Sequence, residues 1–228
     1  MSVAPRGWCP TTLKPMETGD GLLTRLRPGF GRLGLDALGR IADLARRHGN
    51  GAIDATRRGA LQIRGLTPES HRAFVGEALA AGLARDDDVE HRVLVDPLGG
   101  EPALATARAL VAALAGWPSL ALLPAKIGFA IGEVEGDIPL APGADVAGAL
   151  HAAEALIARG ARRGVVAPMA ARRPGLLGQT PSIGLPFGRI EAGTLALLAR
   201  LAAARGASEA RLTPWRALLF VGAAPALL

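Results

Sequence analysis

Basic residues are the side chains of this sequence that could do chemistry, because several of them cluster on one predicted sheet and two more open the middle segment. Arg25 and Arg27 alternate with leucines along residues 21–27, so both side chains leave the same face of a predicted strand. Arginine on a half-buried sheet is costly unless an anion pairs with it, and its planar guanidinium binds carboxylates bidentately. We therefore predict a site for a ligand with several carboxylates. The six substrate-binding candidates are Arg25, Arg27, Arg58, Arg64, Arg92 and Lys126.

The abundance of arginine also has simpler interpretations. Arg25 and Arg27 could instead face solvent, with internal partners such as Asp20, Asp36 or Asp54. A genome rich in G and C would also favour arginine, and Lys14 and Lys126 are the only lysines of the chain. The net charge of +6 would suit nucleic acid, but only 4% of the residues are aromatic and tyrosine is absent. Because base-stacking side chains are this scarce, we expect no nucleic-acid partner.

Neither a metal centre nor a membrane span is expected. Cys9 is the only cysteine, so the chain alone cannot form a disulfide or hold an iron–sulfur cluster with its own thiolates. Its four histidines lack the spacing of metal ligands. The apolar stretch 109–125 contains two prolines and is too short for a bilayer, and residues 1–10 lack a signal-peptide pattern. We expect a cytoplasmic protein with no membrane contact.

An internal repeat predicts the architecture. Residues 30–65 align without gaps with residues 187–222, at a constant offset of 157. Self-similarity of this length indicates one supersecondary unit used twice, packed about a pseudo-twofold axis with ligands at the seam. The identical pairs include Phe30/Phe187, Gly31/Gly188, Arg32/Arg189, Leu44/Leu201, Gly49/Gly206, Thr56/Thr213, Leu61/Leu218 and Gly65/Gly222.

The first copy has the pattern of a ferredoxin-like β-α-β-β-α unit. Its alternating and helical stripes are bounded by Gly49 and by Thr67, which precedes Pro68 as a helix cap. The predicted elements are a strand over 21–27, a helix over 35–48, strands over 52–56 and 60–64, and a helix from 68 to about 83.

We predict an α+β protein with two such half-domains, β-α-β-β(-α), and an α/β middle segment. The segments are 1–90, the first half-domain with an N-terminal arm; 91–180, the middle segment that contacts the ligand; and 181–228, an incomplete second half-domain. The second copy stops after its strands, so the chain is expected to be short relative to its own first copy. The middle segment is predicted to hold helices over 104–115 and 145–159, a strand over 126–131, and irregular stretches over 162–173 and 174–181.

A glycine motif offers a nucleotide-binding alternative. Residues 29–34 read GFGRLG between a strand and a helix, and Asp54 follows 20 residues later, as in a Rossmann site. The first Rossmann strand is buried on both faces, yet this strand carries Arg25 and Arg27. The second copy keeps Phe-Gly-Arg and replaces the outer glycines, which favours a structural turn.

Four blocks of the sequence resemble precorrin-3B synthase, within the wider nitrite and sulfite reductase family. They span nearly the whole chain in order and are longer than a chance motif. The blocks are Trp8–Pro10 with Lys14–Leu23, Asp54–Gly65, Leu123–Phe129 and Leu212–Leu219.

This resemblance implies an oxidoreductase of cobalamin biosynthesis. The family converts precorrin-3A to precorrin-3B with O2, using a 4Fe-4S cluster and an external electron donor, and basic residues hold the carboxylates of the tetrapyrrole. By motif position these residues correspond to Arg25, Arg58, Arg92 and Lys126, while strand geometry adds Arg27 and Arg64. The implied partners are therefore a carboxylate-bearing tetrapyrrole and an electron donor. No general base or oligomeric state can be assigned.

The sequence departs from this family in its redox centre. The cluster cysteines of the family follow the Leu212–Leu219 block, where this sequence ends, and Val93 replaces an asparagine after Arg92. Two interpretations follow: a short form of the oxidoreductase, inactive if it lacks cluster ligands, or a non-catalytic tetrapyrrole-binding relative. A nucleotide-binding protein is the third.

Overall fold

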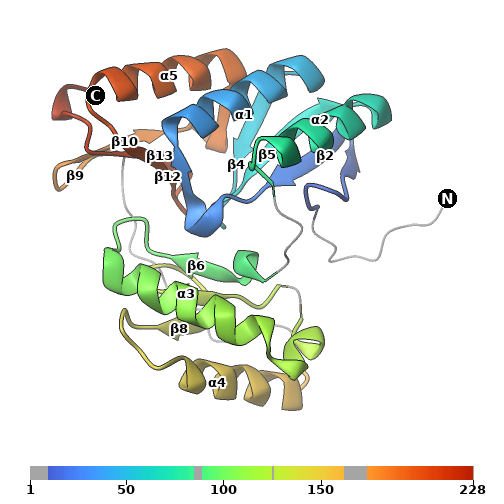
Figure 1. Ribbon diagram of the computed structural model, residues 1–228, viewed down its shortest axis with the longest axis vertical. Helices are drawn as coiled ribbons and strands as arrows, with labels where there is room; N and C mark the ends of the chain where they lie inside the picture. Colours follow the sequence, from blue (N-terminus) through green and yellow to red (C-terminus); the bar gives the residue numbers. More distant parts are fainter. Residues whose placement is uncertain (1–9, 85–88, 125, 162–173, 228) are drawn as a thin grey trace. The chain divides into compact units, whose positions relative to one another are not determined.

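A computed structural model describes residues 10–84, 89–124, 126–161 and 174–227 (Figure 1). The chain divides into two compact units, and each is described by itself. Unit 1 combines residues 1–86 with residues 172–228, and unit 2 comprises residues 87–171. Both copies of the repeat lie in unit 1.

The first sheet of unit 1 contains five antiparallel strands in the order β1-β2-β5-β4-β11. Its strands are β1 (Met16–Thr18), β2 (Gly21–Leu26), β5 (Leu61–Leu66), β4 (Ala52–Ala55) and β11 (Arg189–Glu191). One face is apolar, because Leu26, Ile53 and Ile63 are completely buried in the core that also holds Phe74. Helices α1 (Leu35–His48) and α2 (Pro68–Ala80) contribute to that same core.

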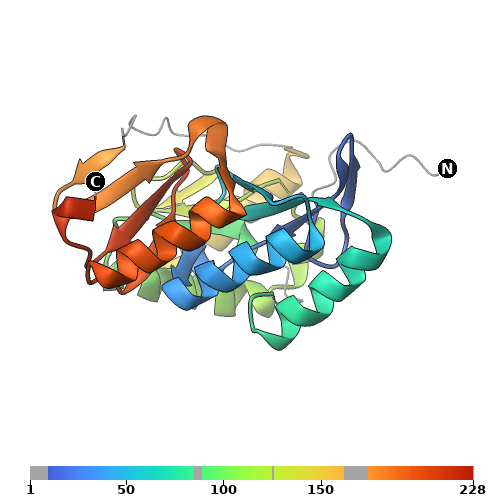
Figure 2. The same cartoon turned by 90° about the horizontal axis from the view of Figure 1, so that it is seen from above.

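The second sheet of unit 1 has the matching order β3-β12-β13-β10-β9. Its strands are β3 (Arg32–Gly34), β12 (Glu209–Leu212), β13 (Ala217–Val221), β10 (Thr180–Gly184) and β9 (Gly175–Leu177). Helix α5 (Ala192–Ala204) packs beside α1, and Figure 2 shows α5, α1 and α2 side by side in one layer.

The two copies exchange a strand. β3 follows the first copy's turn but pairs with β12 of the second sheet, and β11 follows the second copy's turn but pairs with β4 of the first. Each sheet is therefore completed by the other copy.

The structure bears out the repeat and the predicted fold class. The offset of 157 carries the 3-10 turn Gly29–Gly31 and β3 onto the turn Pro186–Gly188 and β11, residue for residue. Even the unusual backbone recurs, since Phe30 has φ 52° and Phe187 has φ 54°. The predicted irregular stretch 174–181 is wrong, however. It forms β9 and the start of β10, joined by a tight turn in which Gly178 adopts φ 63°, a conformation open to glycine.

Local sequence explains where α2 begins. The Thr67 side chain accepts a hydrogen bond from the Ser70 amide at 3.1 Å, and the Ser70 hydroxyl accepts one from the Thr67 amide at 3.0 Å. This reciprocal cap satisfies amides that the first helical turn leaves unpaired. Pro68 then occupies the first helical position, as the sequence predicts.

Unit 2 contains a short parallel sheet in the order β6-β7-β8. Its elements are β6 (Val93–Val95), α3 (Glu101–Ala115), β7 (Phe129–Ile131), β8 (Ile138–Leu140), α4 (Val146–Ala158) and the 3-10 turns Glu90–Arg92 and Pro118–Leu122. The two predicted helices are present, and α3 begins three residues earlier than expected, with Pro102 in its first turn. Within the described residues, none of the helices is long and apolar enough to cross a membrane.

The identical threonines of the repeat yield a stability prediction. Thr213 is completely buried, and its hydroxyl donates to the Ala217 carbonyl at 2.9 Å and accepts from the Ala217 amide at 2.8 Å. Thr213→Val leaves both groups without the hydroxyl, so we expect the free energy of unfolding to fall by roughly 1–3 kcal/mol. Urea denaturation measures this, with Thr213→Ser as the hydroxyl-keeping control. Equal unfolding midpoints for Thr213→Val and the wild type would contradict the role.

Candidate functional site: a basic cavity on the first sheet

A row of polar residues crosses the first sheet on the face opposite its apolar core. Arg25 of β2 lies opposite Gln62 of β5, Gln62 opposite Asp54 of β4, and Asp54 opposite Arg189 of β11. Successive residues of a strand point to opposite faces, and the buried neighbours of these residues face the helices. Each of four adjacent strands thus supplies one side chain, and the exchange of β11 supplies the last.

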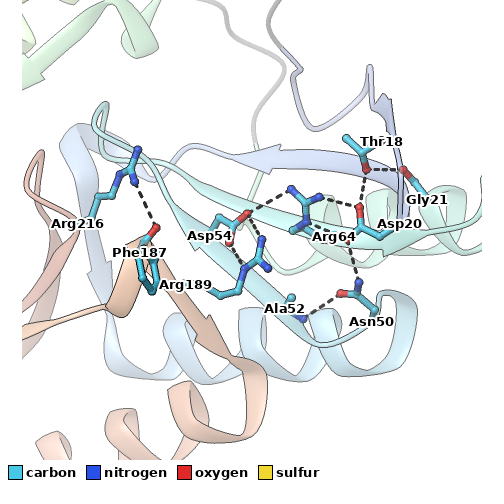
Figure 3. Close-up of polar contacts among 10 residues, drawn as sticks. All are labelled: Thr18, Asp20, Gly21, Asn50, Ala52, Asp54, Arg64, Phe187, Arg189 and Arg216. Atoms are coloured by element: carbon cyan, nitrogen blue, oxygen red, sulfur yellow. Dashed lines mark hydrogen bonds and ion pairs between the residues drawn. The ribbon is translucent and has the colours of Figure 1, made fainter.

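Asp54 is shared by two arginines from different copies. Arg189 donates from Nε and Nη2 to the two Asp54 oxygens at 2.7 and 3.1 Å, and Arg64 donates from Nη1 at 3.3 Å (Figure 3). The pKa of the Arg189 guanidinium is raised, chiefly by its hydrogen bonds to Asp54. These pairs fix the position of Arg189 beside the row.

Arg64 is held mainly by Asp20. It donates from Nε and Nη2 to the Asp20 carboxylate at 2.9 and 2.7 Å, and Thr18 and Asn50 also donate to that carboxylate (Figure 3). The Arg64 hydrogen bond is the main reason why the pKa of Asp20 lies well below its ordinary value. The same pair raises the pKa of Arg64. Two of the three acids named as internal partners for Arg25 and Arg27, Asp20 and Asp54, therefore contact Arg64 instead.

Next to the row lies a cavity of about 650 Å³. The described residues that line it are Arg25, Asp54, Ala55, Thr56, Arg57, Gln62, Phe187, Arg189 and Arg216. Four arginines against one aspartate leave a formal charge of +3 on this lining. The Nε atom of Arg25 is buried, and no group of the described residues accepts its proton. A buried guanidinium donor of this kind is costly until an anion reaches it.

The predicted binding residues fall in different places. Arg25 lines the cavity, Arg27 donates to the Pro10 carbonyl at 3.2 Å, and Arg58 is exposed in the turn beside Arg57. Arg64 is engaged by the two aspartates. In unit 2, Arg92 is buried and donates to the carbonyls of Pro124 and Leu123 at 3.0 and 3.2 Å, and Lys126 is exposed. The roles of all six as ligand-binding residues stay predictions.

Arg25 is the only one of the nine described lining residues that was among the six sequence candidates. The arginines and the aromatic residue that the sequence analysis missed are Arg57, Phe187, Arg189 and Arg216. The repeated Phe-Gly-Arg triplet was the available signal for Phe187 and Arg189. It could be interpreted only as a turn, because nothing in the second copy alone indicates that β11 joins the first sheet.

A larger cavity, of about 880 Å³, lies along α1, α2 and α5, and four arginines against three acids give its lining a formal charge of only +1. Arg47 donates to Glu77 at 2.6 and 2.9 Å and to Asp43 at 2.7 Å. Arg47, followed by His48, lowers the pKa of Glu77 to about 2. Size favours the larger cavity as a binding site. The higher positive charge of its lining and the buried Arg25 donor favour the smaller cavity. We take the smaller one as the candidate site.

The described residues do not fit an iron–sulfur cluster. They contain no group of three or more histidine, cysteine or acidic side chains that could hold a metal ion. The single cysteine, Cys9, lies outside the described residues.

The glycine motif does not form a dinucleotide site. Residues 29–34 make a 3-10 turn and β3, and the preceding strand β2 pairs antiparallel with both of its neighbours. A Rossmann site requires a parallel sheet at that position.

Comparison with known proteins shows that this fold is of the nitrite/sulfite reductase ferredoxin-like class. Residues 14–81 match the family model of the nitrite/sulfite reductase ferredoxin-like half domain. The NirA protein of Mycobacterium tuberculosis superposes with a TM-score of 0.62 over 90% of this chain and 54% of that chain, at 15% identity, which shows the fold alone.

A more specific likeness comes from sequence. A precorrin-3B synthase from Sinorhizobium sp is 43% identical over 101 residues, which is 42% of this chain and 20% of that protein. This similarity confirms the resemblance to precorrin-3B synthase over the matched part of the chain. The matched region spans about a fifth of the length of that relative.

The Asp20–Arg64 pair yields a pH prediction. The folded-state pKa of Asp20 is depressed below its unfolded value of about 3.9, so its stabilisation is complete above that value and is lost as pH falls through the folded pKa. We expect Asp20→Asn to unfold at lower urea than the wild type at pH 7. The difference should shrink as pH falls below about 4. Glu17→Gln is the charge-matched control on the neighbouring strand. A difference independent of pH would contradict the pairing.

Proposed function

We propose that this protein binds a carboxylate-bearing tetrapyrrole in the basic cavity, in the manner of a precorrin-3B synthase-type oxidoreductase acting on precorrin-3A. The observation that carries the proposal is the buried Arg25 donor without an acceptor among the described residues, in a lining of charge +3. A tetrapyrrole with acetate and propionate groups supplies several anions at fixed spacing. The cytoplasmic location expected from the sequence is part of this proposal.

The arginines differ in what they can do for such a ligand. Arg189 is held by Asp54, so it presents a positioned guanidinium and loses little conformational freedom on binding. Arg25 offers its buried Nε to a carboxylate oxygen, and a charge-assisted hydrogen bond of this kind is among the stronger ones in proteins. Arg57 and Arg216 lie in the same lining and add positive potential toward an approaching polyanion. Arg27, Arg58, Arg92 and Lys126 belong to the proposal by motif position or strand geometry.

Redox chemistry forms the finer part of the proposal. Conversion of precorrin-3A to precorrin-3B with O2 needs electrons, which in the resembled family come through a 4Fe-4S cluster and an external donor. The residues described here supply binding and orientation, and no general base is assigned among them. The alternative is a non-catalytic tetrapyrrole-binding relative, favoured by the lack of a metal-holding group among the described residues. Iron content and visible absorption of the anaerobically purified protein separate the two.

Arg25 gives the direct test of binding. We expect Arg25→Ala to weaken uroporphyrin binding about 10- to 100-fold, because one charge-assisted hydrogen bond is lost in a buried position. Quenching of porphyrin fluorescence measures the affinity. Arg72→Ala is the matched control, since it removes one positive charge from the exposed side of α2, outside the cavity lining. Unchanged affinity in Arg25→Ala, with the control also unchanged, would refute this cavity as the site.

A further inference from the structure

Strained backbone is concentrated at the basic cavity. Among the described residues, three that are not glycine adopt a left-handed backbone: Phe30 at φ 52°, Phe187 at φ 54° and Arg216 at φ 59°. Phe187 and Arg216 both line the cavity. They also form a hydrogen bond, since Nη1 of Arg216 donates to the Phe187 carbonyl at 3.2 Å (Figure 3). Such conformations cost free energy for L-residues and are enriched at active sites and ligand-binding sites.

The repeat provides an internal control for Arg216. At the offset of 157, its counterpart in the first copy is Gly59, with φ 61°. The turn therefore has the same conformation in both copies, and glycine adopts it without steric cost. The architecture of the turn does not require arginine at position 216.

The repeat provides a second control for Phe187. Its counterpart Phe30 has the same backbone and is half-buried, whereas Phe187 is 98% exposed. A fully exposed aromatic ring at the edge of a charged cavity gains nothing from packing in the free protein. Burial of this ring by a bound ligand would be favourable.

We propose that Phe187 and Arg216 form a clamp that selects ligands with flat pyrrole-type rings. This inference rests on the proposed function and names the feature that separates a tetrapyrrole from other polycarboxylates. Arg25 and Arg189 recognise negative charge, which many metabolites carry. The Phe187 ring stacks on a planar face, and the guanidinium of Arg216 does the same while it pairs with a peripheral carboxylate.

Gly188 supports this geometry. A Cβ atom at position 188 would lie 2.5 Å from Cδ of Arg216, so only glycine lets the arginine side chain lie along the turn. Gly188 also has φ 80°. The turn Pro186–Gly188 thus positions both members of the clamp.

Two variants and two probes test the clamp. The probes are uroporphyrin, a planar tetrapyrrole polycarboxylate, and butane-1,2,3,4-tetracarboxylate, which has no ring. We expect Phe187→Ala to bind uroporphyrin about tenfold more weakly and the tetracarboxylate unchanged. Leu201→Ala, which truncates another exposed apolar side chain on α5, should change neither.

Arg216→Gly tests the strain. Glycine is the residue that the first copy uses in this turn, so we expect the unfolding temperature of Arg216→Gly to equal or exceed that of the wild type. Its affinity for uroporphyrin should nevertheless fall about tenfold. A variant that is at least as stable but binds less tightly separates a ligand role from a structural one.

The outcomes distinguish the clamp from the site. If Phe187→Ala binds uroporphyrin as the wild type does while Arg25→Ala does not, the cavity stands and the clamp is refuted. If Phe187→Ala weakens the binding of both probes equally, the Phe187 ring does not distinguish a planar ligand from one without a ring, and the clamp is again refuted. If the wild type fails to bind uroporphyrin, both the proposed function and the clamp are refuted.

Discussion

The exchange of β3 and β11 between the two copies is the constraint on which the rest of unit 1 depends. An unpaired strand presents open amide and carbonyl groups, and here β4 and β12 each gain a partner strand from the other copy. Helices α1 and α5 pack together over this exchange. The exchange also brings Arg189 opposite Asp54, which are 135 residues apart in the chain. The candidate site is therefore a product of the repeat, and neither copy contains it alone.

The two copies have diverged along this row. In the second sheet the corresponding positions are Ser182, Leu219, Arg211 and Arg32, linked across adjacent strands in the same order. Ser182 and Leu219 are almost completely buried, whereas the first row borders an open cavity. Glu209 pairs with both Arg32 and Arg211. One architecture thus buries much of the row in one sheet and places it beside a cavity of formal charge +3 in the other, which favours the first sheet as the place where an anion binds.

The sequence predicted those features that depend on local pattern. Period and caps located α1 and α2, and the offset of 157 located the second copy because it preserved the Phe-Gly-Arg turn. Pairing between distant strands has no such local signal, so the exchange of β11 and the lining by Arg189 and Arg216 could not be predicted. The hairpin of β9 and β10 was missed because the glycines and prolines of this stretch suggested irregular chain.

Arginine partners show the same limit in the site itself. Alternation along β2 and β5 indicated which arginines lie on the polar face, but it could not show that Arg64 is held by Asp20 while the Arg25 donor has no acceptor among the described residues. That difference depends on the turn at Asp20, which brings its carboxylate to β5. Composition alone gave both arginines equal weight as ligand contacts.

A crystal structure of the protein with bound uroporphyrin tests the central claim most directly. The account predicts a carboxylate of the macrocycle within hydrogen-bonding distance of Arg25 Nε, with the ring against the side chains of Phe187 and Arg216. A macrocycle seated instead in the larger groove along α1, α2 and α5, with the basic cavity free of ligand, would contradict it.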